Sequence, residues 1–205
     1  MNTDLTKLPW DPLSISQIGQ LLKHFPAEWL IAGGYAIELF VGRSFRRHGD
    51  LDIWILRKDQ QLLPVFIKQW EFFIANQGQL TPWEPDQYIA FPIQSLWARA
   101  KGLNLWQLQI MLVDVEGEDW LYRRDPSIRL PFELVKRMSK EEVPYLAPEI
   151  QLLYKSKLPM REKDQIDFDW TSPLLPTTSK AWLSTQLSFL YPQGHPWITQ
   201  MKDDR

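Results

Sequence analysis

The chain has 205 residues, a formal net charge of −2, 44% hydrophobic residues and no cysteine. The near-neutral charge argues against broad nucleic-acid binding, which needs a surplus of lysine and arginine, and the lack of cysteine excludes disulfides and thiolate zinc sites. No run approaches the ~20 apolar residues of a membrane span, and the first residues lack the layout of a signal peptide. We therefore expect a cytoplasmic protein without a membrane partner.

The spacing of apolar residues predicts helices and strands in a mixed order along the chain. The first elements are a helix at 13–24, a strand at 29–32, a turn and helix at 33–42, a strand at 50–56 and a helix at 61–69. Short apolar runs then predict strands at 71–75, 89–91, 95–100, 106–116 and 120–123, of which 106–116 should be central. From Pro148 onwards the pattern predicts helices at 149–157, 162–169 and 179–190.

The stretch at 29–56 contains the strongest functional pattern. Gly33-Gly34 lies between an apolar run and a helix, so the backbone can approach a ligand closely and the helix start can bind an anion. Asp50 and Asp52 are two residues apart in a predicted strand, so both carboxylates should project from one face. Two carboxylates beside a phosphate-binding helix start predict a site for Mg²⁺ and a nucleotide.

Two basic residues lie between the glycines and the aspartates. Arg46 and His48 either belong to a solvated loop, or they neutralise a triphosphate and order the aspartates through hydrogen bonds. We favour the second interpretation. Of the two, Arg46 is the expected phosphate contact, because its planar fork matches phosphate oxygens.

Together these residues resemble the signature of the nucleotidyltransferase superfamily, whose fold is also called polymerase-beta-like. The string is most similar to a branch of small aminoglycoside and lincosamide nucleotidyltransferases and their uncharacterised bacterial relatives. The matching positions are Gly33-Gly34-Tyr35-Ala36, Glu38, Gly42 and Arg46-x-His48-x-Asp50-x-Asp52. Segments similar to those relatives recur at 120–124, 144–149, 153–155 and 161–164, so the resemblance covers residues 25 to 168.

The resemblance implies an α+β fold with a nucleotidyltransferase-like mixed sheet flanked by helices. Residues 1–146 would form the nucleotidyltransferase-like domain, and residues 147–205 a C-terminal helical extension packed on it. It further implies transfer of a nucleoside monophosphate from an NTP, with ATP the expected donor, to the hydroxyl of a small molecule. Mg²⁺ would be the cofactor. The implied metal ligands are Asp50 and Asp52, and the implied nucleotide-binding residues are Gly33, Gly34, Arg46, His48 and Lys155.

One position departs from the family pattern. The family has a third carboxylate on a neighbouring strand, and alignment of that strand with 106–112 places Gln109 there. Glutamine can coordinate a metal weakly through its carbonyl, but it cannot accept a proton at neutral pH. Asp114 is five residues further along the predicted strand, about 16 Å away and on the opposite face, and Glu116 also has the wrong parity. The sequence therefore predicts a slow enzyme, a base supplied by the substrate, or no activity.

Three functions remain open from the sequence. The first is an active nucleotidyltransferase with a small-molecule acceptor. The second is a catalytically weakened or inactive homologue that binds a nucleotide or a protein partner, and the third is an antitoxin-type nucleotidyltransferase that modifies a partner protein. Two further carboxylates, Asp164 and Asp167, lie three residues apart on a predicted helix, and we expect them to be surface charges rather than a second acceptor site.

Overall fold

The structure is a computed structural model and describes residues 4–203. An eight-stranded mixed sheet has the order β10-β11-β1-β2-β6-β5-β3-β4, and a three-stranded sheet has the order β7-β8-β9. The strands are β1 (Trp29–Ala32), β2 (Asp52–Leu56), β3 (Trp70–Asn76), β4 (Gln79–Pro82), β5 (Ser95–Ala100), β6 (Leu108–Val113), β7 (Val115–Glu116), β8 (Asp119–Leu121), β9 (Arg129–Pro131), β10 (Lys136–Met138) and β11 (Pro144–Leu146).

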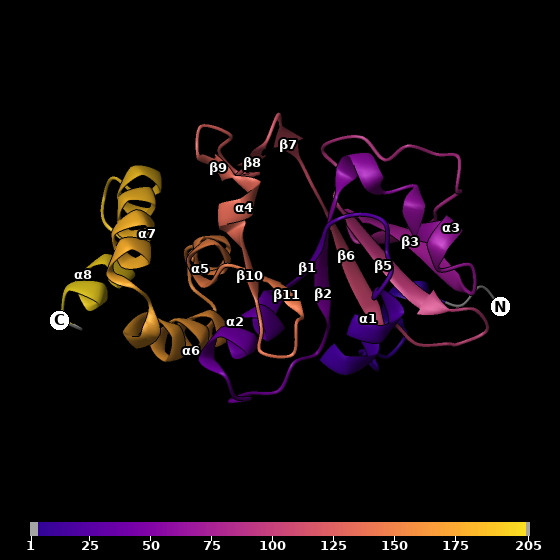
Figure 1. Ribbon diagram of the computed structural model, residues 1–205, viewed down its shortest axis with the longest axis horizontal. Coiled ribbons are helices and arrows are strands. Elements are labelled where there is room, and N and C mark those ends of the chain that lie inside the picture. The colour runs from indigo at the N-terminus through magenta and orange to yellow at the C-terminus, as the bar shows by residue number, and fades with distance from the viewer. Residues whose placement is uncertain (1–3, 204–205) are drawn as a thin grey trace.

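The α-helices lie toward the two ends of the large sheet (Figure 1). They are α1 (Ile15–Leu21), α2 (Gly33–Val41), α3 (Leu62–Phe66), α4 (Phe132–Val135), α5 (Pro148–Lys155), α6 (Glu162–Thr171), α7 (Thr177–Leu190) and α8 (Pro196–Asp203). At one end α3 lies beside β3, and at the other α5 and α6 lie beside α2, with α7 and α8 further out (Figure 1). α5 contacts α2, α6 and α7, so the C-terminal helices pack directly on the helix that follows β1.

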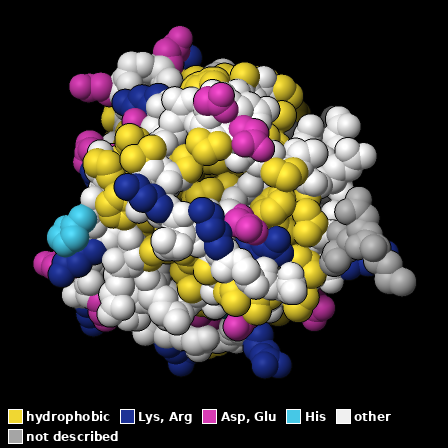
Figure 2. Space-filling view, turned by 90° about the vertical axis from the view of Figure 1, so that its right-hand side faces the viewer, with side chains coloured by type: hydrophobic (Ala, Val, Ile, Leu, Met, Phe, Trp, Pro, Cys, Tyr) yellow, Lys and Arg dark blue, Asp and Glu magenta, His cyan; other side chains and the backbone are white. Residues whose placement is uncertain are grey.

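The central strands are apolar along their length because protein covers both of their faces. Leu30 and Ile31 of β1 and Ile53 of β2 are fully buried. α2 ends at Gly42, whose left-handed backbone, with φ of 80°, is the expected helix stop. Figure 2 shows the end of the molecule that holds α3, where hydrophobic side chains alternate with charged ones of both signs, as the small net charge predicts.

The register of the central strands places three site positions in one row. β1 pairs antiparallel with β2, so that Ala32 lies opposite Asp52. β2 pairs in parallel with β6, so that Asp52 lies opposite Gln109. The last residue before the glycines, the second aspartate and the glutamine are therefore neighbours across the sheet.

The structure confirms the predicted α+β class with a mixed sheet flanked by helices. The predicted strand at 89–91 is wrong, because Ile89 is buried in a loop in which the side-chain oxygen of Gln60 accepts its N–H. The predicted strand at 106–116 is interrupted at Asp114, and the strand predicted from Asp50 begins at Asp52. The strands and α-helices that the sequence did not predict are α4, α8, β4, β9, β10 and β11.

Apart from α8, which has eight residues, these unpredicted elements are three or four residues long and are too short to show a hydrophobic periodicity. The division at residue 146 stays a prediction. Within residues 4–203 no helix is long and apolar enough to cross a membrane.

Candidate functional site

A cavity of about 840 Å³ lies over the row formed by Ala32, Asp52 and Gln109. Its wall comes from β1, the start of α2, the loop at 46–50, β2, β6, the segment at 121–126, α5 and the residues before and at the start of α6. The structure thus brings every residue that the sequence assigned to the site to a single cavity: Gly33, Gly34, Arg46, His48, Asp50, Asp52, Gln109 and Lys155.

Both glycines are required by side chains of the site itself. Gly33 has φ of 67°, and a Cβ at this position would collide with the carboxylate of Asp52. A Cβ on Gly34 would collide with the ring of His48 and the guanidinium of Arg46. The Gly-Gly pair therefore lets the aspartate and the basic loop lie directly against the start of α2.

Gln151 is a cavity residue that sequence reasoning missed. It lies on α5, and its side-chain Oε1 accepts a 2.7 Å hydrogen bond from the N–H of Gly33. Part of the anion-binding capacity that the sequence predicted at the helix start is thus already used within the protein. The two residues are 118 positions apart, so no local pattern could have indicated the pair.

Asp50 and Asp52 place two carboxylates at the cavity wall. Burial, together with the charge of Asp50, raises the pKa of Asp52 to about 7. Lys155 and two other nearby cations oppose this rise without cancelling it. A cation bound beside Asp50 and Asp52 would stabilise the ionised form of Asp52 and lower its pKa. Across residues 4–203 no cluster of three acidic or histidine residues is present that could hold a metal alone.

Gln109 lies next to Asp52, as the alignment predicts. Its Nε2 donates to the hydroxyl of Ser95 at 3.1 Å and contacts the sulfur of Met111 at 3.4 Å. This orientation leaves the carbonyl oxygen of Gln109 as the group available to a cation in the cavity. The site therefore has two carboxylates and one neutral oxygen.

The placement predicted for Asp114 on the opposite face is wrong. β6 ends at Val113, so the alternation of a continuous strand no longer applies, and Asp114 lines the same cavity. Its carboxylate accepts hydrogen bonds from Nε and Nη2 of the buried Arg57, at 2.5 and 2.9 Å. Glu116 lies in β7, outside the cavity wall, and pairs with Arg129.

The loop before β2 is organised by Glu38 of α2. Its Oε1 accepts hydrogen bonds from the hydroxyl of Ser44 and the N–H groups of Phe45 and Arg46. His48 Nε2 is 3.0 Å from the same oxygen. Burial lowers the pKa of His48 below its ordinary value, and the charge of Arg46 lowers it further while Glu38 opposes the change. His48 is thus a neutral packing partner of Gly34 at physiological pH.

Asp164 and Asp167 are not the surface charges that the sequence predicted, because both are buried. Arg46 donates to both carboxylate oxygens of Asp167, at 2.5 and 2.8 Å, and the ammonium of Lys155 lies 2.7 Å from Asp167. Lys155 also approaches Asp164 at 3.4 Å, and Arg161 pairs with Asp164. Tertiary packing of α6 on α2 and α5 thus converts a polar helix face into a buried ionic network.

This network corrects the expected environment of two site residues. The fork of Arg46 binds Asp167, so only its remaining N–H groups and its charge are left for a nucleotide. Lys155 is buried rather than a surface lysine, and it still lines the cavity. Positive side chains outnumber carboxylates in the cavity wall. The cations are Arg46, Arg47, Arg123, Arg124, Lys155, Arg161 and Lys163, and the carboxylates are Asp50, Asp52 and Asp114.

Comparison with known proteins finds a matching family and similar folds. The family of aminoglycoside-2''-adenylyltransferases matches residues 14–73. The structure of the lincosamide antibiotic adenylyltransferase LnuA with lincomycin bound is 15% identical, with a TM-score of 0.56, over 80% of this chain and all of that chain. The solution structure of the antibiotic-resistance factor ANT(2'')-Ia is 13% identical, with a TM-score of 0.57, over 87% of this chain and 91% of that one. No curated protein sequence matches the chain. The chain therefore has the fold of the nucleotidyltransferases.

A third nucleotidyltransferase-like structure resembles nearly the whole chain. It is an antigenic nucleotidyltransferase-like protein from Paracoccidioides brasiliensis, 19% identical, with a TM-score of 0.50, over 98% of this chain and 93% of that one. The nucleotidyltransferase fold therefore includes the C-terminal helices that supply Gln151, Lys155 and the carboxylates of α6. The family match at 14–73 covers the glycines and both aspartates but ends before Gln109.

Proposed function

We propose that this protein transfers a nucleoside monophosphate from an NTP, with ATP the expected donor, to the hydroxyl of a small molecule in the presence of Mg²⁺. The main support is the close approach of Asp52, His48 and Arg46 to the two glycines at the wall of a large, cationic cavity. A helix start, two carboxylates and several cations in one cavity suit a metal-bound triphosphate.

The residues of the site fit a magnesium ion. Mg²⁺ in nucleotide sites is commonly held by one or two carboxylates together with substrate phosphates and waters, and Asp50 and Asp52 supply two. The raised pKa of Asp52 is the observation that favours a cation here. When bound, the ion would supply charge stabilisation at the reacting phosphorus.

The remaining cavity cations would bind and orient the triphosphate. Lys155 is positioned by Asp167 and Asp164, and Arg161 by Asp164, so the positions of their charges are fixed before the nucleotide arrives. Lys163 makes no ion pair among the described residues and lines the same wall. Positive groups that are fixed in advance lose little freedom when substrate binds, which favours the in-line arrangement that phosphoryl chemistry needs.

In the proposed reaction the acceptor oxygen bonds to the α-phosphorus as the bond from that phosphorus to the bridging oxygen breaks and pyrophosphate leaves. With Asp50 and Asp52 assigned to the metal, the hydroxyl proton passes to water or to a substrate oxygen, because the amide of Gln109 cannot take it. General-base assistance is typically worth 10²–10⁴-fold in rate, so we expect slow turnover.

A second candidate is a homologue that binds nucleotide without turnover. Gln109 favours it, because the site lacks the third carboxylate of the family pattern and Asp114 is bound to Arg57. In this case the cavity would still bind NTP, but no nucleotidyl group would be transferred.

Label transfer separates the two candidates. The protein is incubated with Mg²⁺, α-labelled ATP or GTP and panels of hydroxyl compounds, and nucleotide binding is followed in parallel by thermal shift. We expect slow labelling of an acceptor that Asp52→Asn abolishes. A nucleotide-induced thermal shift without labelling would support the binding homologue, and the absence of both would contradict the enzymatic and the binding proposals alike.

A further inference from the structure

The cavity has two halves that lie at opposite ends of the parallel pair β2 and β6. Asp52 pairs with Gln109 at one end, and Leu56 pairs with Val113 at the other. Four residues of strand separate these levels by about 13 Å. Gly33, Gly34 and the aspartates lie at the first end, which we call the phosphate half. The far half contains Gln94, Val113, Asp114 and the segment at 121–126.

The far half has positive charge that no carboxylate neutralises. Arg124 donates to the hydroxyl of Tyr122 at 3.0 Å and to the carbonyl of Tyr154 at 2.9 Å, and both acceptors are uncharged. Arg123 lines the cavity and makes no ion pair within the described part of the chain. A ligand that approaches this wall therefore meets two uncompensated guanidinium groups.

Asp114 does not offset that charge. It is the carboxylate of the far half, and both of its oxygens accept hydrogen bonds from Arg57. Arg57 is itself fixed, because its Nη1 donates to the carbonyls of Ile89 and Ile93 at 3.1 and 2.6 Å. A cationic ligand would have to compete with Arg57 for this carboxylate, and the loss of Asp114 would leave the buried guanidinium of Arg57 without its ion-pair partner, which is costly.

The rest of the far half is apolar, with one polar group that is free. Leu121 and Pro126 line it, and Tyr154 belongs to the same cavity wall. Gln94 is only 7% exposed, and its side-chain amide has no hydrogen-bond partner among residues 4–203. Gln94 lines the cavity wall and its amide is not one of the fully buried unpaired groups, so a ligand in the cavity can hydrogen-bond to it in place of water. The far half thus offers apolar contact, one amide and positive charge.

We propose that the far half binds the acceptor and selects a hydroxyl compound that is anionic or uncharged and has an aromatic or other apolar group, and that it rejects polycations such as aminoglycosides. This inference rests on the proposed function, because attack on the α-phosphorus requires the acceptor hydroxyl and the triphosphate to meet in this one cavity. The inference is based on the charge of the far half: a polyamine needs free carboxylates, whereas the far half has two unpaired guanidinium groups and a carboxylate that is already bound to Arg57.

Binding of matched probes tests the charge preference directly. The probes are 4-nitrophenyl β-D-glucuronide (anionic), 4-nitrophenyl β-D-glucoside (uncharged), 4-(aminomethyl)phenyl β-D-glucoside (cationic) and tobramycin (polycationic). Each is titrated calorimetrically into the full chain with Mg²⁺ and a non-hydrolysable ATP analogue, and again without nucleotide. We expect the glucuronide to bind tightest, the uncharged glucoside next, and the two cations at least about ten-fold more weakly than the glucuronide.

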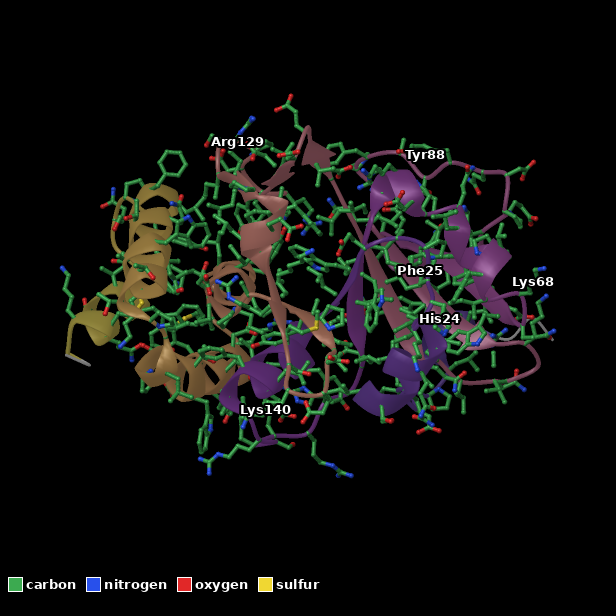
Figure 3. All side chains as sticks on the ribbon, in the orientation of Figure 1. His24, Phe25, Lys68, Tyr88, Arg129 and Lys140 are labelled. Atoms are coloured by element: carbon green, nitrogen blue, oxygen red, sulfur yellow. The ribbon has the colours of Figure 1, made fainter. Side chains whose placement is uncertain are left out.

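Two variants locate the preference. Arg123 is exposed, so Arg123→Glu should fold, weaken glucuronide binding about ten-fold and improve binding of the cationic glucoside. Gln94→Leu should weaken the uncharged glucoside about three- to ten-fold, the value of one hydrogen bond, and leave the affinity for the ATP analogue unchanged. The matched control is Lys140→Glu, which makes the same change of charge on an exposed residue outside the cavity (Figure 3) and should alter none of these affinities.

Several results would overturn the inference. These are tighter binding of either cation than of the glucuronide, no binding of any aryl glycoside, or an effect of Arg123→Glu on the ATP analogue alone, which would assign the far half to the nucleotide base. Transfer assays with the same probes test the proposed function separately. If the affinities follow the predicted order but no label is transferred, the proposed selectivity stands and the proposed enzymatic activity is contradicted. If tobramycin is labelled preferentially, the enzymatic activity is supported and the proposed selectivity is contradicted.

Discussion

Arg46 and Asp167 form a buried bidentate ion pair across 121 residues of chain. Nε and Nη2 of Arg46 donate to the two carboxylate oxygens of Asp167 at 2.5 and 2.8 Å, and Asp167 is fully buried. The pair ties the loop that precedes β2 to α6, while the guanidinium of Arg46 also lies against Gly34. The C-terminal helices thereby determine where the basic loop is held relative to the helix start.

Asp167→Asn should therefore destabilise the protein. The substitution leaves Arg46 and Lys155 buried with too little negative charge, and the loss of one partner from a buried network typically costs about 3 kcal/mol. Urea denaturation should show this loss in the free energy of unfolding. Asp169→Asn, on the exposed face of the same helix, is the matched control and should change it by less than about 0.5 kcal/mol. Equal stability of the two variants would contradict a structural role for the network.

Gly34→Ala should weaken the binding of nucleotide. The new Cβ would push His48 and Arg46 away from the helix start, and we expect at least a ten-fold weaker Kd for an ATP analogue, measured by calorimetry. Gly19→Ala in α1 adds the same methyl group where it meets only ordinary van der Waals contact, and it should bind normally. An unaltered Kd in Gly34→Ala would exclude the helix start from the nucleotide site.

Gln109→Glu should raise any measured transfer rate. The variant restores the third carboxylate next to Asp52, where it can act as a general base or complete the metal site. We expect an increase in kcat of about ten-fold or more, read from initial rates of label transfer at saturating Mg²⁺. Met111→Glu, two residues along the same strand and also at the cavity wall, is the control for added charge. If neither variant is faster than the natural sequence, residue 109 does not occupy the position of the base.

The pKa of Asp52 predicts a pH-dependent stability in the metal-free protein. The folded-state pKa of about 7 is above the ordinary value of 3.8, so ionisation of Asp52 opposes folding. The penalty grows as the pH rises from about 4 to about 7 and is constant above that. With EDTA present, Asp52→Asn should raise the Tm by several degrees at pH 8 and by much less at pH 5.

Added Mg²⁺ tests the cause of that difference. If the ion binds beside Asp52, it should raise the Tm of the natural protein at pH 8 and leave the Tm of Asp52→Asn nearly unchanged. Asp86→Asn, an exposed substitution outside the cavity, should leave the Tm in EDTA unchanged and should keep the gain in Tm that Mg²⁺ gives the natural protein. A gain in Tm for Asp52→Asn that is the same at both pH values would mean that Asp52 titrates normally.

The sequence by itself was sufficient for those features of the protein that depend on residues close together in the chain. Hydrophobic period predicted most helices and the central strands, and the glycines and aspartates at 33–52 indicated the superfamily, because each depends on residues close together in the chain. Strand alignment also placed Gln109 beside Asp52 correctly. What the sequence could not decide was which charges are compensated.

Only the tertiary structure decided that Arg46 and Lys155 bind buried carboxylates, that Arg57 neutralises Asp114, and that Gln151 caps the N–H of Gly33. Each of these pairs depends on how elements pack rather than on a periodic pattern. The parity argument for Asp114 failed for the same reason, because strand alternation ends where the chain leaves the ladder. The positions of the reactive groups follow from local sequence, and their electrostatic state follows from distant contacts.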